Sequence, residues 1–275
     1  MKIKYSKKIM FIFKSTIVLL SVLFVIILTS VLYYKQVLSS EALTYSEKAN
    51  ALQTGAMMNN TPTALNSIKP TPAPTEALVV IDPGHGGEDL GTYSGQVYEK
   101  EVNLDISLRL GQLLKKEGIK ILLTRDKDIF VGLRERSNLA NEREGTLFIS
   151  IHNNNMPDDS GYKGTETLYC PSGGFETKEM NGERFAAIVQ DALVKRLNTV
   201  NIGTIARPNL SVLHRTKMPA IIAEIGYISN YGERNRLDSG SFRQEAADAL
   251  CSAIIKTMKE MNAQKGTDNR WMIQY

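Results

Sequence analysis

Over the last two thirds of the chain, short apolar runs alternate with segments of helical periodicity. Short segments rich in apolar or β-branched residues are typical of strands, and they span residues 78–81, 119–123, 147–151, 165–169, 211–213 and 220–223, of which 147–151 is a continuous apolar run and therefore a buried strand. Helical spacing of apolar residues covers 103–116, 133–141, 175–197 and 241–261, and Asn230 followed by Glu233 predicts one further helix start. Strands separated by helices predict one α/β domain, with a mostly parallel or mixed sheet covered by helices on both faces.

The first apolar stretch of the chain is much longer than these runs. Residues 15–34 carry no charge, and as a helix these twenty residues span about 30 Å, the thickness of the hydrocarbon layer of a membrane. Lysines are concentrated on its N-terminal side, which favours a cytoplasmic N-terminus. We therefore predict a cytoplasmic basic tail over 1–14 and a transmembrane anchor over 15–34, which makes this a single-pass protein of the cell membrane. The alternative is a cleaved signal peptide, whose apolar core is usually about 7–15 residues long. In either case the rest of the chain lies outside the cytoplasm.

Residues 35–76 connect this stretch to the α/β domain. Four of the nine prolines lie here, among Thr, Ala, Asn and Ser residues. Because so few apolar residues cannot compensate for the entropy lost on ordering, the segment is predicted to be a disordered linker. The α/β domain is expected over 77–264. A polar tail over 265–275 follows, in which the single Trp271 is expected to be disordered.

Charge and cysteine content exclude several classes of protein. The net charge is +4, but six lysines lie within the first 35 residues, so the rest of the chain carries about −2. No basic face is left for nucleic acid. Two cysteines, Cys170 and Cys251, are too few for a disulfide-stapled scaffold. An exported protein permits a bond between them, but we predict two reduced, partly buried thiols.

The candidate chemistry lies where predicted strands end. His85 follows the first strand of the domain within a glycine-rich segment, and His152 directly follows the most apolar strand. In a parallel sheet, ligands bind outside the carboxyl ends of the strands, so these two side chains are expected to converge. Two histidines in equivalent positions predict a metal site, although each taken alone is more often structural.

Two glutamates complete the candidate site. Glu99 lies on the loop after His85, close to the start of the helix predicted near residue 103, where its charge also favours the helix dipole. Two histidines and one carboxylate form a donor set of catalytic zinc, with the fourth position open to water. Glu224 ends an apolar strand, and a carboxylate buried there is costly without a partner. We interpret Glu224 as a general base beside the metal.

These residues occur within a longer pattern that resembles a known family. The chain is similar to the zinc-dependent N-acetylmuramoyl-L-alanine amidases, and specifically to their amidase type 3 family, which cleaves bacterial peptidoglycan. The similar segments cover about two thirds of the chain; they are 80–87, 98–104, 124–126, Leu133 with Arg136, 140–141, 148–152, 164–166, 212–213 and 219–230.

The resemblance implies a reaction and a role for each site residue. It implies that His85, Glu99 and His152 bind one Zn²⁺ and that Glu224 is the catalytic acid–base group. The implied fold is a three-layer α/β sandwich around a mixed sheet. The implied substrate is peptidoglycan, hydrolysed at the amide bond between N-acetylmuramic acid and L-alanine of the stem peptide.

The chain departs from the family pattern at some positions. Three asparagines, 153–155, follow His152, and they either contact the stem peptide or cap the strand. Only eleven residues separate His152 from Gly164, whereas family members with an autoinhibitory helix carry a longer insertion there. We therefore expect an open site. His214 stands where the family more often has arginine, and it is an alternative third ligand, a groove residue or a surface residue.

Some residues and functions compete with these assignments. Glu101 is a near neighbour of Glu99, although the motif favours Glu99. Arg134, Glu135, Arg136 and Arg143 are expected to form a solvated or paired helix face. The domain could also be an inactive peptidoglycan-binding scaffold, or a zinc peptidase or deacetylase acting on another cell-wall bond. The presence of both histidines and both glutamates argues against the scaffold. The residues do not indicate a protein activator.

Overall fold

The computed structural model describes residues 73–171 and 180–274. The predicted basic tail, the predicted anchor over 15–34 and most of the predicted linker lie outside the described residues. Among the helices of the described ranges, none is long and apolar enough to cross a membrane.

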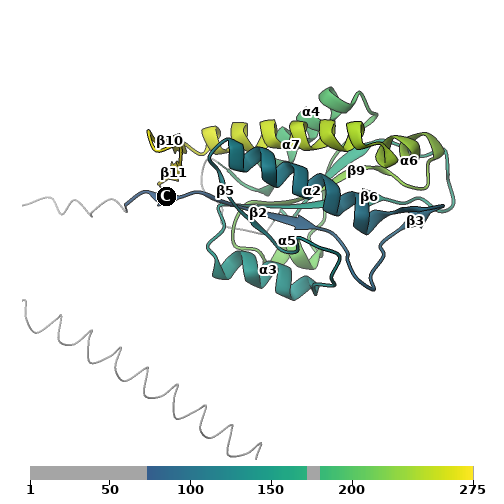
Figure 1. The fold of residues 1–275 in the computed structure, drawn as a ribbon, viewed down its shortest axis with the longest axis horizontal. Helices are drawn as coiled ribbons and strands as arrows, with labels where there is room; N and C mark the ends of the chain where they lie inside the picture. The colour runs from purple at the N-terminus through teal and green to yellow at the C-terminus, as the bar shows by residue number, and fades with distance from the viewer. Residues whose placement is uncertain (1–72, 172–179, 275) are drawn as a thin grey trace, which may run out of the picture. The chain divides into compact units, whose positions relative to one another are not determined.

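A six-stranded mixed sheet forms the centre of the described domain (Figure 1). Its order is β5-β2-β6-β9-β7-β8, with β2 at Leu78–Pro83, β5 at Lys120–Leu123, β6 at Leu147–Asn154, β7 at Thr165–Tyr169, β8 at Asn201–Ala206 and β9 at Ala220–Tyr227. All neighbouring pairs are parallel except β7 and β9, which are antiparallel. The predicted mixed sheet is therefore confirmed.

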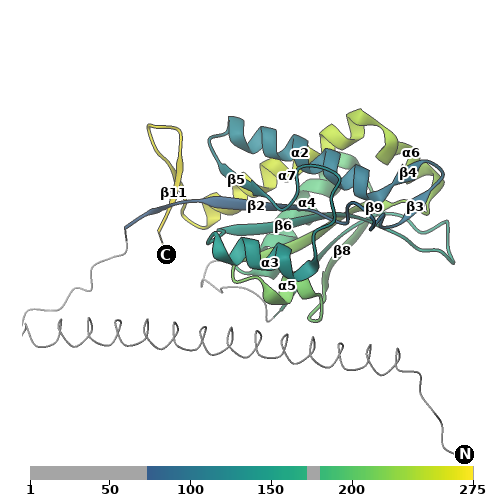
Figure 2. The ribbon, with the colours of Figure 1, turned by 60° about the horizontal axis from the view of Figure 1, so that its bottom comes forward.

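Helices cover both faces of this sheet. Helices α2 (Glu99–Lys116), α4 (Gly182–Leu197) and α7 (Gly240–Glu260) lie on one face, and α3 (Leu133–Glu142) and α5 (Ser211–Arg215) lie on the other (Figures 1 and 2). The alternation of side chains along β2 explains the two layers, because Val79 and Ile81 join the first core while Leu78 and Val80 join the second. The result is a three-layer α/β sandwich.

Local signals fix where the helices begin. Helix α2 begins at Glu99, four residues earlier than predicted, and Glu99 and Glu101 place acidic side chains in its first turn. Helix α4 begins at Gly182 because the Asn181 side chain accepts a hydrogen bond from the Arg184 amide. The predicted helix began at residue 175, and 175–179 lie outside the described residues. The start predicted at Asn230 is confirmed for α6 (Tyr231–Asp238), since Asn230 accepts from the Glu233 amide.

In the second half of the domain, one predicted element was wrong and one strand was missed. Residues 211–213 were expected to form a strand but belong to helix α5, whose Val212 and Leu213 are buried on one side of a short helical turn. Strand β8 was missed because this edge strand is half-exposed and lacks a continuous apolar run.

The C-terminal segment is folded, contrary to the prediction of a disordered tail. Strands β10 (Gln264–Lys265) and β11 (Trp271–Ile273) pair with each other, and β11 also pairs with β1 (Thr75–Glu76). Trp271 is only 5% exposed, and its indole Nε1 donates to the Glu117 carbonyl oxygen over 3.0 Å. Folded structure therefore extends beyond both ends of the predicted range 77–264.

Candidate metal centre

His85 lies two residues after the end of β2 in a left-handed backbone conformation, with φ of 59°. Its Nδ1 is 2.8 Å from Asp89 Oδ2, while its Nε2 is 3.2 Å from Glu99 Oε1. Asp89 thereby orients the ring, as the outer carboxylates of histidine–metal sites do. Burial lowers the pKa of His85, but Glu99 and Asp89 outweigh it and raise that pKa to about 9.

Glu99, the first residue of α2, is buried at the centre of the cluster. Its Oε1 lies 2.9 Å from His152 Nδ1 and accepts from the Asn153 amide over 3.2 Å. The Thr92 amide donates to its Oε2 over 2.9 Å. Burial opposes ionisation of this carboxyl, but the hydrogen bonds from the two histidines outweigh it and hold the pKa of Glu99 well below its usual range. The group is a carboxylate poised as a ligand.

The cluster is compact because glycines let the backbone approach it. A Cβ on Gly84 would lie 2.3 Å from the His152 ring, and one on Gly91 would lie 2.5 Å from Glu99 Oε2. Ligand atoms of His85, Glu99 and His152 all lie within 4.8 Å of one another. Ligands about 2.1 Å from a tetrahedral zinc are about 3.4 Å apart, so this donor set fits zinc.

Glu224 lies beside the cluster on β9. It is in register with His152 on one neighbouring strand, β6, and with Glu166 on the other, β7. Its Oε2 is buried and has no hydrogen-bond partner among the residues that the structure describes. Burial raises the pKa of Glu224 to about 7. A buried carboxyl oxygen without a partner, next to a metal-binding cluster, is suited to exchange a proton with a reactant.

The asparagines after His152 support the site from within the protein. The register of β6 and β9 shifts between His152 and Asn154, and Asn153 is buried at this irregularity. The Asn153 side chain donates to Asn103 Oδ1 over 2.8 Å. Asn154 donates to Glu166 Oε1 over 2.6 Å. The backbone amide of Asn153 thus donates to Glu99, and the side chain of Asn154 donates to Glu166, which is paired with Glu224 across β7 and β9.

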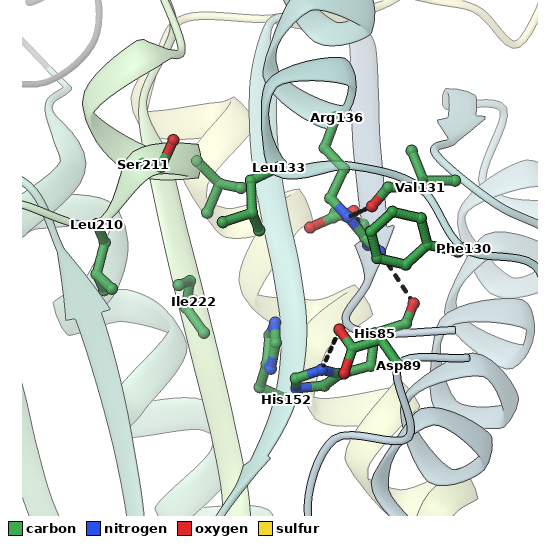
Figure 3. A pocket seen from close by; sticks show the side chains of 12 residues that line it. His85, Asp89, Phe130, Val131, Leu133, Arg136, His152, Leu210, Ser211 and Ile222 are labelled. Atoms are coloured by element: carbon green, nitrogen blue, oxygen red, sulfur yellow. Dashed lines mark hydrogen bonds and ion pairs between the residues drawn. The ribbon is translucent and has the colours of Figure 1, made fainter. Parts of the chain in front are cut away.

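A cavity of about 420 Å³ opens beside the two histidines. Figure 3 shows both imidazole rings at one end of it, with mainly apolar side chains around the rest. These side chains come from the loop before α3 and its first residue, from the N-terminal end of α5 and from β9; they include Phe130, Val131, Leu133, Leu210, Val212 and Ile222. The cavity is large enough for part of a substrate next to the cluster.

The comparisons with known proteins agree with this geometry. The family model described as N-acetylmuramoyl-L-alanine amidase (Amidase_3) matches residues 79–256. The chain belongs to this family. It is 35% identical over 176 residues to the uncharacterised protein YqiI of Bacillus subtilis, which covers 64% of this chain and 82% of YqiI. It is 33% identical over 177 residues to the N-acetylmuramoyl-L-alanine amidase LytC of the same organism, which covers 64% of this chain and 34% of LytC.

Solved amidase structures share the fold. AmiC2 of Nostoc punctiforme matches with a TM-score of 0.63 and 33% identity, over 68% of this chain and 99% of that one. The catalytic domain of CwlV from Paenibacillus polymyxa matches with a TM-score of 0.61 and 31% identity, over 66% of this chain and 98% of that one. The chain is therefore a peptidoglycan hydrolase of the N-acetylmuramoyl-L-alanine amidase class.

The structure also distinguishes between the competing candidates for site residues in this amidase. Glu101 is exposed, whereas Glu99 is buried in the cluster. His214 is exposed in the last turn of α5 and is not part of the candidate metal-binding group found among the described residues. Residues 155–164, between β6 and β7, form turns without a helix, as expected for an open site.

Sequence reasoning missed or misjudged several residues around the amidase site. Arg136 was expected on a helix face with Arg134, but it is 3% exposed and pairs with buried Asp82 over 2.7 Å. The contact between Asp89 and His85 could have been predicted from the sequence, because Asp89 lies only four residues after His85. The Cys170 thiol donates to the Pro208 carbonyl oxygen, and Cys251 is a buried thiol, in agreement with the prediction of reduced cysteines.

Proposed function

We propose that this amidase is zinc-dependent and hydrolyses the amide bond between N-acetylmuramic acid and L-alanine of peptidoglycan stem peptides. His85, Glu99 and His152 would hold one Zn²⁺, and Glu224 would be the acid–base group. The observation that carries the proposal is the cluster of three ligand atoms within 4.8 Å, with a buried, unpaired carboxyl oxygen on the adjacent strand.

In this proposal the residues that bind zinc differ from the residue that transfers protons. When bound, zinc supplies Lewis acidity, which polarises the scissile carbonyl and lowers the pKa of water towards about 7. Glu99 contributes a negative charge held by amide donors, and Asp89 keeps Nδ1 of His85 occupied so that Nε2 faces the cluster.

Glu224 then carries the proton. Its carboxylate accepts a proton from the attacking water, and its carboxylic acid returns that proton to the departing amine of L-alanine. The products are the lactyl carboxylate of N-acetylmuramic acid and a free stem peptide. The position of Glu224 beside the cluster, with one carboxyl oxygen free of protein partners, suits both halves of this cycle, since the group must accept and then release the proton.

We also propose the arrangement of the whole chain. Residues 1–14 would lie in the cytoplasm, 15–34 would anchor the protein in the membrane, and the residues from 35 to the start of β1 at Thr75 would link the anchor to an extracytoplasmic catalytic domain. The support is the uncharged twenty-residue stretch and its lysine-rich N-terminal flank.

The test compares the full-length wild-type chain, purified in detergent, with Glu224→Gln. Exposed Glu101→Gln is the matched control. Each protein is assayed for zinc content and incubated with purified peptidoglycan, and the released fragments are identified by mass. Wild type and the control are expected to bind one zinc and release intact stem peptides with new L-alanine N-termini. Glu224→Gln is expected to keep zinc and lose about 10²- to 10⁴-fold of the rate.

Different products would identify the rival functions. Cleavage within the stem peptide indicates a peptidase, and release of acetate indicates a deacetylase. Zinc binding by wild type without any cleavage indicates a scaffold. An undiminished rate in Glu224→Gln contradicts the role assigned to that residue.

A further inference from the structure

At the end of β2 the chain leaves the sheet towards His85: Pro83 is the last residue in register with β6, and the Gly84 amide still donates to the Ile151 carbonyl oxygen over 3.0 Å. The carbonyl groups of Pro83, Gly84 and His85 turn into the protein, where each needs a hydrogen-bond donor. Two buried arginines supply these donors, Arg125 and Arg136, which are 2% and 3% exposed. Neither arginine is among the residues proposed to bind zinc or to transfer protons.

Arg136 reaches this segment from helix α3 on the second core face. Its Nη1 donates to the Pro83 carbonyl oxygen over 2.7 Å, and its Nη2 donates to the His85 carbonyl oxygen over 2.9 Å. The same Nη1 lies 2.7 Å from Asp82 Oδ1. The guanidinium therefore connects the last part of β2 to the backbone of the metal-binding histidine (Figure 3).

Arg125 reaches the same segment from the end of β5. Its Nε donates to the Pro83 carbonyl oxygen and its Nη2 to the Gly84 carbonyl oxygen, both over 2.9 Å. The same Nη2 donates to the Lys100 carbonyl oxygen in the first turn of α2 over 2.8 Å. One guanidinium thus joins the segment before His85 to the helix that begins with Glu99.

The backbone of His85 needs such support. A residue with a side chain rarely adopts a positive φ, and such a conformation persists only where the surroundings enforce it. At His85 this conformation directs the imidazole towards Glu99. Asp82, which anchors Arg136, is itself held by the hydroxyls of Thr124 and Ser150. A buried ion pair contributes little net stability, so its value here lies in geometry.

We propose that Arg136 and Arg125 are positioning residues that hold His85 in the geometry required to bind zinc. The inference rests on the proposed zinc site. The planar fork of Arg136 spans Asp82, Pro83 and His85 at once, and a lysine ammonium at the same position keeps the charge but cannot make all three contacts. Replacing Arg136 by lysine is therefore expected to weaken zinc binding, because His85 is no longer held in the required geometry.

The experiment measures the zinc dissociation constant of the full-length chain by competition with a chromophoric chelator, for wild type, Arg136→Lys and Trp271→Ala. Trp271 is buried far along the chain from the cluster, and its variant controls for lost stability alone. Arg136→Lys is expected to bind zinc about 10- to 100-fold more weakly. Trp271→Ala is expected to melt at a lower temperature with an unchanged zinc affinity. Arg125→Lys, with the same expected loss, replaces Arg136→Lys if circular dichroism shows that the latter is unfolded.

A double-mutant cycle separates positioning from a general structural effect. In a His85→Ala background, Arg136→Lys is expected to change the zinc affinity less than twofold, because its effect acts through His85. Equal losses in both backgrounds overturn the inference, as does an unchanged affinity in folded Arg136→Lys and Arg125→Lys. Absence of zinc binding by wild type, or unchanged binding by His85→Ala, overturns the proposed zinc site instead.

Discussion

Glu224 lies in a row of polar side chains that crosses three neighbouring strands. His152, Glu224 and Glu166 occupy paired positions on β6, β9 and β7. This row places the carboxyl of Glu224 next to His152, a residue of the candidate metal cluster, without a loop, so the spacing is set by the sheet itself. Within the described residues, the Oε2 atom of Glu224 is buried and has no hydrogen-bond partner.

The protonation of Glu224 affects the stability of the metal-free protein. Burial raises the pKa of Glu224 from 4.5 to about 7, so the stability gained by the protonated group is complete below pH 4.5 and is lost as the pH rises through 7. We expect the free energy of unfolding of wild type, relative to Glu224→Gln, to fall by up to roughly 3 kcal/mol between pH 4 and pH 8. Urea unfolding in the presence of a chelator measures it. A constant difference between the two proteins would contradict the shifted pKa.

His214 provides a second test among single residues. Its exposed side chain in α5 is outside the metal-binding group, so His214→Ala is expected to keep one zinc and wild-type affinity. His85→Ala is expected to lose at least one order of magnitude in affinity, since it removes a ligand. Zinc content by atomic absorption after dialysis measures both. Loss of zinc from His214→Ala would favour a three-histidine site.

Among the secondary-structure elements, those with a strong pattern were predictable and those that depend on distant partners were not. The apolar runs of β2, β6 and β9 and the periodicity of α2 and α7 could be read directly from the sequence. Strand β8 has a half-exposed pattern, and α5 is too short to show a period. Strands β10 and β11 owe their order to Trp271 and to pairing with β1, about two hundred residues earlier in the chain.

The small sheet of β1, β10 and β11 makes a testable contribution to stability. Trp271→Ala removes a buried indole and its hydrogen bond to Glu117, and we expect it to lower the free energy of unfolding by about 3–5 kcal/mol. Tyr231→Ala, at a side chain that is 70% exposed, is the control and is expected to change it by less than about 0.5 kcal/mol. Denaturant unfolding measures both. Equal stability of Trp271→Ala and wild type would mean that this sheet is not a cooperative part of the domain.

At the scale of the whole molecule, the candidate site residues could be predicted from the sequence more readily than the residues that hold them in place. The sequence placed His85, His152 and Glu224 at strand ends. In the structure His85 follows β2, whereas β6 and β9 continue two and three residues beyond His152 and Glu224, and all three side chains still lie towards the carboxyl ends of their strands, beside Glu99. Arg136 contacts the backbone of His85 across 51 residues, and Asn153 contacts Asn103 across 50. The sequence separation of such pairs follows no regular pattern, because the two residues come together only when the helices pack against the sheet.

The proposed anchor makes a prediction about the intact protein. If residues 15–34 span a membrane, the full-length chain is expected to remain in the membrane fraction after washing with high salt or alkaline carbonate, and to dissolve only in detergent. Fractionation followed by N-terminal sequencing measures this. A soluble extracellular product that begins after residue 34 would show that the segment is a cleaved signal peptide.

The central claim is that His85, Glu99 and His152 hold one zinc ion beside Glu224. Diffraction from crystals of the zinc-loaded protein, collected on both sides of the zinc absorption edge, tests it most directly. We predict a single anomalous peak about 2.0–2.2 Å from a ring nitrogen of each histidine and from a Glu99 carboxylate oxygen. A peak on another set of residues, or none at the cluster in protein that contains zinc, would contradict the account.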